Sequence, residues 1–80
     1  MIQEMTLIQF LSVVNQYDTI VLKITHGRDN PEDRLACTAQ DFIRGGTIDV
    51  NAELFGLPLN SYFVETITAA RNGIEVMLYV

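Results

Sequence analysis

The stretch YFVETITAARNGIEVMLYV, residues 62–80, decides the fold of this chain. Its Asn72-Gly73 pair lies between two runs that are rich in β-branched and aromatic residues. Asn-Gly flanked by alternating apolar residues is the strongest short-range signal for a hairpin with a type I′ turn. We therefore predict two antiparallel strands, over residues 62–71 and 74–80.

The register of this hairpin sorts its side chains onto two faces. With Asn72 and Gly73 at the turn, Arg71 lies opposite Ile74, and Ile67 opposite Leu78. One face then carries core-like residues, namely Ile67, Ala69, Ile74, Val76, Leu78 and Val80. The other face is mixed, with Val64, Thr66, Thr68, Ala70, Glu75, Met77 and Tyr79. Either short helical segments cover this second face, or its Tyr and Met side chains, with Tyr62 nearby, form a contact patch.

Working outward, the rest of the chain predicts a helix and two more strands. A helix is expected over roughly residues 4–16, with Thr6 as its N-cap. Residues 19–25 alternate as a strand with one buried face. A polar loop over residues 27–33 then leads into a short strand over residues 34–38. The apolar helix positions follow the spacing of a single face: Leu7, Phe10, Leu11 and Val14.

Two brief helical segments are expected between these strands and the final hairpin. The first covers residues 39–44, with Thr38 as its N-cap and Gly45-Gly46 at its C-terminus. The second covers residues 51–55 and ends at Gly56 and Pro58. The sequence thus predicts one α+β domain over residues 1–80, in the order α-β-β-α-α-β-β. Its N-terminal helix packs on a four-stranded, mostly antiparallel sheet whose strand order stays open.

Length and composition exclude several classes of protein. The chain has 80 residues, 49% hydrophobic and 19% charged, which is the composition of a globular domain. It is too short for a dinucleotide-binding α/β enzyme or a TIM barrel. No apolar run is long enough to span a membrane, and the start has no basic segment typical of a signal peptide. A lone Cys37 suits a reducing compartment, so we expect a cytoplasmic protein.

The charge balance argues against direct binding of nucleic acid. Ten acidic residues face five Lys plus Arg, which gives a net charge of −5. Duplex binding requires clustered cations. Here the cations are scattered along the chain: Lys23, Arg28, Arg34, Arg44 and Arg71.

The residues capable of catalysis or metal binding form no recognised motif. His26 is the only histidine, so any nucleophile–histidine pair must use it, with Cys37, Ser12 or Ser61 as its partner. We interpret Cys37 as a small buried residue and His26 as a solvated loop residue. His26, Asp29, Glu32 and Asp33 could ligate a divalent ion, but their spacing matches no known site. The sequence therefore predicts a non-catalytic protein without metal or cofactor.

Two features are candidate binding surfaces. The first is the acidic loop, with Asp29, Glu32 and Asp33. It is either a solvated hairpin tip or a negative finger that docks on a basic groove. The second is the mixed ribbon face with Met77 and Tyr79. Pairing of an exposed strand edge with a partner or a second copy is a more general possibility.

The chain resembles the short acidic proteins encoded by bacterial phages and mobile elements. Four segments carry the resemblance: the opening helix Thr6-Leu7-Ile8-Gln9-Phe10-Leu11, then Tyr17-Asp18, then Asp41-Phe42-Ile43, and the terminal strand from Ile74 to Leu78. Anti-CRISPR inhibitors are similar in size, acidity and α+β build. The resemblance implies an inhibitor that either occupies a basic, nucleic-acid-binding surface of a host protein such as a CRISPR effector or locks the conformation of that protein. It identifies no site residues.

Three hypotheses follow for the function. The first is an inhibitory binding protein that engages a basic surface of a host protein and acts without binding nucleic acid itself. The alternative is a self-associating accessory domain, so either a monomer or a homodimer is expected. A hydrolase built around Cys37 and His26 is the third.

Overall fold

The computed structural model describes residues 4–25, 32–71 and 73–80. Its central sheet and single α-helix are formed by β1 (Met5–Thr6), α1 (Leu7–Val13), β2 (Ile20–Ile24), β3 (Asp33–Cys37), β8 (Phe63–Ala70) and β9 (Gly73–Tyr79). The connecting segment contains η1 (Ala39–Phe42), β4 (Ile43–Arg44), β5 (Thr47–Ile48), β6 (Glu53–Leu54), β7 (Leu57–Pro58) and η2 (Leu59–Ser61), where η marks a 3-10 turn. The α+β class predicted from the sequence is confirmed.

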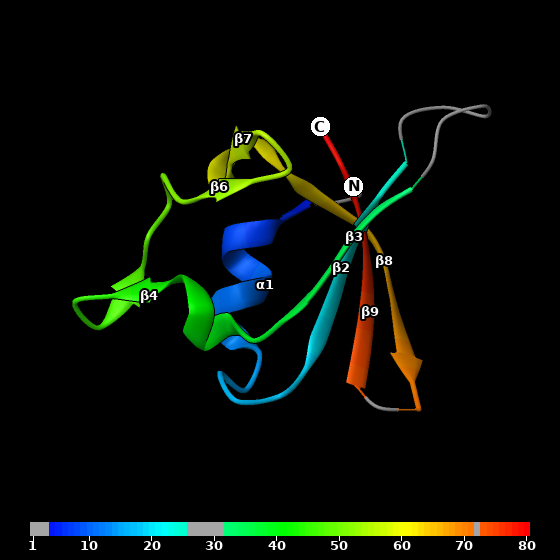
Figure 1. The fold of residues 1–80 in the computed structure, drawn as a ribbon, viewed down its shortest axis with the longest axis horizontal. Coiled ribbons are helices and arrows are strands. Elements are labelled where there is room, and N and C mark those ends of the chain that lie inside the picture. Colours follow the sequence, from blue (N-terminus) through cyan, green and yellow to red (C-terminus); the bar gives the residue numbers. More distant parts are fainter. Residues whose placement is uncertain (1–3, 26–31, 72) are drawn as a thin grey trace.

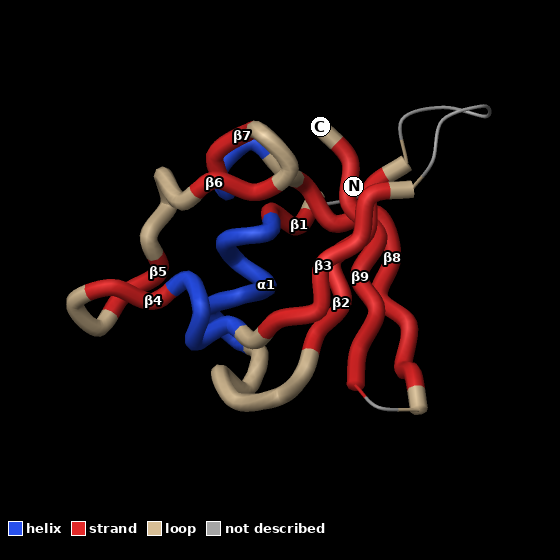
Figure 2. The backbone as a smooth tube through the Cα atoms, viewed as in Figure 1, coloured by secondary structure: helices blue, strands red, loops and turns tan. Residues whose placement is uncertain are grey.

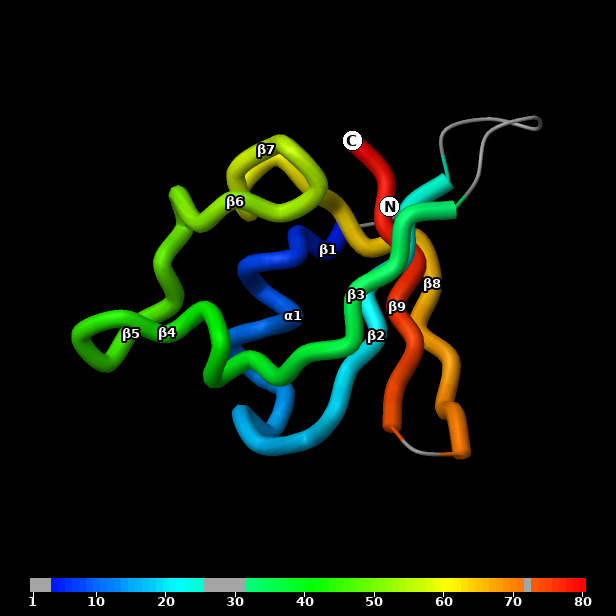
Figure 3. Tube along the Cα trace, viewed as in Figure 1, coloured from blue at the N-terminus to red at the C-terminus, as the bar shows by residue number. Residues whose placement is uncertain are grey.

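The sheet has five strands in the order β1-β8-β9-β2-β3, and it is mixed. The predicted number of four strands is wrong, because a two-residue strand, β1, adds to β8. Three of the four strand pairs are antiparallel, as expected, and the parallel pair is β2 with β9. Figure 3 shows β2 and β9 side by side, although the first lies near the start of the chain and the second at its end. Pairing between strands so distant in sequence leaves no local signal.

Helix α1 begins where the sequence places its cap but is shorter than predicted. The Thr6 hydroxyl accepts from the Gln9 backbone N–H, and the Gln9 side chain accepts from the Thr6 N–H, so the two residues form a capping box. Helical geometry ends at Val13. Shortly after it, the Asn15 side chain accepts from the Tyr17 N–H at 2.9 Å, which holds the chain in a turn. The helix therefore ends at Val13 and does not reach residue 16, as was predicted.

The predicted helical segments are partly replaced by two small hairpins. Gly45 and Gly46, expected to end a helix, have φ angles of 62° and 86° and form the turn between β4 and β5. Phe55 and Gly56, with φ of 52° and 91°, form the turn between β6 and β7 where a helix was expected. Two consecutive positive φ angles are typical of a type I′ turn. Only the first segment survives, as the 3-10 turn η1.

The terminal hairpin forms, but its register differs from the prediction by two residues. Ala70 lies opposite Gly73, and Ile67 opposite Val76 rather than Leu78. A bulge at Glu65 then interrupts the pairing between β8 and β9. Past the bulge, Val64 pairs with Leu78 and so joins the core side of the sheet, opposite to its predicted face.

All the buried residues lie on one side of this sheet. Figure 1 shows α1 and both small hairpins on the same side of the strands, and Figure 2 shows the 3-10 turns there too. The prediction that the short helical segments cover the second face is therefore wrong. Among the described residues the core consists of Leu7, Phe10, Leu11, Ile20, Leu22, Ile24, Ala39, Phe42, Leu54, Leu59, Tyr62, Val76 and Leu78.

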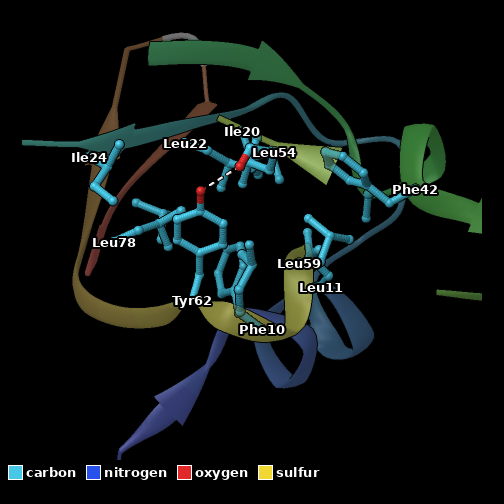
Figure 4. Packing of buried hydrophobic residues seen from close by; sticks show 13 residues of the cluster. Phe10, Leu11, Ile20, Leu22, Ile24, Phe42, Leu54, Leu59, Tyr62 and Leu78 are labelled. Atoms are coloured by element: carbon cyan, nitrogen blue, oxygen red, sulfur yellow. Dashed lines mark hydrogen bonds between the residues drawn. The ribbon is translucent and has the colours of Figure 1, made fainter. Parts of the chain in front are cut away.

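Tyr62 lies at the centre of this core and away from the second face. Its side chain is 1% exposed. Its hydroxyl donates to the Leu54 carbonyl, as Figure 4 shows, and its ring meets Phe55 edge-on at 6.5 Å. The phenol is thus buried with its polar group satisfied. The hairpin β6–β7 is anchored to the core through this contact.

Candidate functional site

The face of the sheet turned away from α1 is the candidate site. We call it the open sheet face. Side chains alternate along each strand, so the residues between the buried ones point to this side. They form aligned rows across the strands, one being Thr66, Met77, Lys23 and Arg34, and the next Thr68, Glu75, Val21 and Ala36. None of these eight residues is buried.

The open sheet face carries an aromatic patch at one end. The rings of Phe63 and Tyr79 stack with centroids 5.5 Å apart and an interplanar angle of 24°. Met77 lies on the same strand face, two residues before Tyr79. We define these three residues as the aromatic patch. The structure therefore brings together Met77 and Tyr79, both predicted as contact residues.

Phe63 was missed by the sequence reasoning. A regular hairpin would place Phe63 on the core side and Val64 on the open side. The bulge at Glu65 exchanges them, so Phe63 pairs with Tyr79 and Val64 with Leu78. No residue type near Glu65 indicates a bulge, because the position of a bulge depends on how the whole strand pairs.

Two carboxylates border the aromatic patch. Glu4, Glu65 and Tyr79 line a shallow hollow of about 460 Å³, together with Met5, Val64, Thr66 and Ile67. The pKa of Tyr79 is raised, first by loss of solvent and then by the charge of Glu4, a hydrogen bond with Glu4, and the charge of Glu65. The Tyr79 hydroxyl therefore lies near two negative charges.

A group of ion pairs occupies the other side of the open sheet face. The Glu75 carboxylate accepts from Arg34 at 3.3 Å and lies 3.7 Å from the Lys23 ammonium. Glu32 also lies 3.7 Å from the Lys23 ammonium. These charges compensate one another, so this region offers less unbalanced charge than the border of the aromatic patch.

The predicted acidic loop is only partly within the described residues. Asp29 and His26 lie outside them. Glu32 forms the ion pair with Lys23, and Asp33 is the first residue of β3. Both residues belong to the β2–β3 end of the sheet, whereas Tyr79 pairs with β8. The structure does not join the two predicted contact surfaces through any described ion pair.

Another hollow lies between α1 and the β4–β5 hairpin. It measures about 570 Å³ and is lined by Ile8, Leu11, Ser12, Val14, Gln16, Ile43, Gly46, Thr47 and Ile48. None of these side chains ionises. The hollow therefore offers no ionisable group that could act as a general base for its Ser12 or Thr47 hydroxyl.

The surroundings of Cys37 make its thiol less reactive than that of an ordinary cysteine. The thiol is half-buried at the end of β3. Burial, followed by the charge of Asp41, raises its pKa from 9.0 to about 11. A catalytic thiol requires a lowered pKa, because the thiolate is the attacking species.

Cys37 is expected to react slowly with iodoacetamide in the folded protein. With its pKa near 11, the thiolate fraction at pH 8 is roughly 100-fold lower than for an ordinary cysteine. Because the pKa is raised, the rate should keep increasing up to about pH 11 instead of levelling off near pH 9. The measurement is a pH series of alkylation rates by mass spectrometry, with the urea-unfolded chain as the control. Equal rates in both states at pH 8 would contradict it.

No group of three or more potential metal ligands occurs among residues 4–25, 32–71 and 73–80. No helix in the same residues is long and apolar enough to cross a membrane. Comparisons with protein-family models, curated proteins and solved structures find no match to this chain.

Proposed function

We propose that this chain is a non-catalytic binding protein that engages a partner protein through the aromatic patch on its open sheet face. The observation that carries the proposal is the stacked Phe63–Tyr79 pair, which lies on an uncovered sheet face beside two carboxylates. Exposed aromatic and Met side chains are enriched at the centres of protein interfaces.

The chemistry around the patch favours a basic partner surface. An Arg or Lys side chain can lie against the face of a tyrosine or phenylalanine ring. The same cation can reach the Glu4 or Glu65 carboxylate that borders Tyr79. The net charge of −5 adds a long-range attraction to such a surface.

We place this binding in the context that the resemblance implies. The chain then acts in the bacterial cytoplasm as an inhibitor encoded by a phage or mobile element. Its partner is a host protein with a basic, nucleic-acid-binding surface, a CRISPR effector being one candidate. The unreactive setting of Cys37 supports the non-catalytic assignment over the hydrolase hypothesis.

Affinity capture from an extract of the bacterial host tests the proposal. The bait proteins are the natural chain, a Met77→Ala/Tyr79→Ala variant, and Val13→Ala as the matched control, because Val13 is 79% exposed on α1. We expect one protein to be retained by the natural chain and by the control. For that purified protein, the double variant should bind roughly 30-fold more weakly, as expected when a central aromatic contact is removed.

Two results would contradict the proposal. One is equal affinity of the double variant and the control for the retained protein. The other is direct binding of a fluorescent DNA or RNA oligonucleotide by the isolated chain at physiological salt, since the proposal rests on a charge balance that argues against a phosphate-binding surface. Circular dichroism of each variant checks that its fold is intact.

A further inference from the structure

Strand β8 leaves most of one edge unpaired in the described structure. β1 pairs only with Phe63 and Val64 at the start of β8. Residues 66–70 pair with β9 on one side and have no described strand on the other. Figure 1 shows the far half of β8 at the margin of the sheet. An unpaired edge presents backbone N–H and C=O groups that can pair with another chain.

The two edges of this sheet differ in how well they are protected against pairing with another strand. The opposite edge strand, β3, begins with the charged pair Asp33 and Arg34, and charged side chains discourage edge pairing. Residues 66–70, Thr-Ile-Thr-Ala-Ala, contain no charge and no proline. In their middle, Ile67 is 48% exposed. This combination of β-branched residues and an exposed apolar side chain favours addition of a strand.

The ends of this uncharged segment carry opposite charges. Glu65 precedes it and Arg71 follows it, and both are exposed. Neither residue forms a salt bridge within the described part of the chain. Residues 65–71, which we call the β8 edge, thus read Glu-Thr-Ile-Thr-Ala-Ala-Arg. Such a segment is complementary in charge to an antiparallel copy of itself.

We propose that two copies of this chain form a homodimer by antiparallel pairing of their β8 edges about Thr68. In this register Glu65 of each copy lies opposite Arg71 of the other, and Ile67 lies opposite Ala69. The dimer contains two such cross-strand ion pairs, one at each end of the uncharged segment. Charge complementarity favours a second copy as the occupant, because this register brings its Arg71 toward the Glu4 and Glu65 carboxylates, which line one hollow.

The backbone geometry agrees with this register. Each residue pairs with one an even number of places away along the same strand, as Ile67 pairs with Ala69. Residues two apart present their backbone groups to the same edge and their side chains to the same face. Both members of every pair within residues 66–70, which follow the bulge at Glu65, therefore meet edge to edge, and the two open sheet faces lie on the same side of one continuous sheet. This inference does not depend on the proposed function.

Charge exchange between the two ends provides the test. Glu65→Arg leaves Arg at both ends of the β8 edge, and Arg71→Glu leaves Glu at both ends. Each single variant should dimerise about tenfold more weakly or worse, because both ion pairs become repulsions. An equimolar mixture of the two variants should form a heterodimer, since every Arg then faces a Glu. The double variant E65R/R71E should dimerise like the natural chain.

Sedimentation equilibrium and native mass spectrometry measure these outcomes, because the two single variants differ in mass. Ile67→Lys is a second probe that places a charge on an exposed position of the same edge, and it should also weaken the dimer. A natural chain that stays monomeric at millimolar concentration overturns the proposal. So does a dimer that none of the variants weakens, or a mixture that fails to form the heterodimer.

Discussion

Tyr62→Ala should lower the free energy of unfolding by about 4 kcal/mol, the usual cost of removing a fully buried aromatic ring. Tyr62 is 1% exposed and its hydroxyl donates to the Leu54 carbonyl. The substitution leaves a cavity beneath the β6–β7 hairpin and removes the hydrogen bond to the Leu54 carbonyl. A domain of this length has a total stability of roughly 4–12 kcal/mol. Urea unfolding followed by circular dichroism should find that the variant has lost about a third or more of this stability.

Two further variants separate the contributions at this position. Tyr62→Phe keeps the ring and should cost only about 1 kcal/mol for the lost hydrogen bond. Tyr17→Ala removes a tyrosine that is 71% exposed and should change stability by less than about 0.5 kcal/mol. If Tyr62→Ala and Tyr17→Ala unfold at the same urea concentration, the described core is wrong.

Gly73→Ala should lower the free energy of unfolding by about 3 kcal/mol, which combines backbone strain and a steric clash. Gly73 has a φ of 150°, a conformation that other residues rarely adopt. A Cβ atom at this position would lie 3.1 Å from the Thr19 carbonyl carbon and closer still to its oxygen. That same oxygen accepts from the Ile74 N–H at 3.2 Å. The clash therefore falls where β9 begins its parallel pairing with β2.

Gly46→Ala is the matched control. Gly46 also has a positive φ, 86°, but a Cβ atom there meets nothing within 4 Å. The free energy of unfolding of this variant should fall by only about 1 kcal/mol, because of conformational strain. Urea unfolding of both variants gives the comparison. Equal losses would mean that Gly73 does not approach β2 as closely as described.

The dimer and the aromatic patch can act together in binding a partner, and separate experiments test each of them. A dimer through the β8 edges would present two aromatic patches on one side of a continuous sheet. A partner with two basic sites could then bind both patches with increased avidity. If the charge exchange leaves oligomeric state unchanged while Met77→Ala/Tyr79→Ala still loses the captured protein, the chain binds its partner as a monomer.

Local features of the fold were predictable where the determining residues are neighbours in sequence. Thr6 and Gln9 form a capping box within one helical turn, so the start of α1 is visible in the sequence. The alternation of Ile20, Leu22 and Ile24 predicts a strand with one buried face, and the structure confirms it. By contrast, Gly45-Gly46 suits a helix end and a hairpin turn equally, because both require positive φ.

The candidate site was only half predictable for a related reason. Met77 and Tyr79 lie two apart on one strand, and period-two alternation places them together from sequence alone. Phe63 reaches them only because the bulge at Glu65 shifts the pairing of β8. The contribution of Glu4 depends on β1 pairing with β8, a contact between the two ends of the chain. No local sequence pattern predicts the bulge or the pairing of β1 with β8.

By itself, the sequence determined that residues 62–80 form a hairpin with an apolar side and a mixed side. Both facts follow from turn residues and alternation, which act between neighbours along the chain. Only the tertiary structure decided the register of that hairpin, its parallel partner β2, and the fact that no described helix or small hairpin covers its mixed side. These depend on which strands, distant in the sequence, pair at the same edge and on which face α1 covers. The arrangement that forms is the one that buries the whole core, with Tyr62 at its centre.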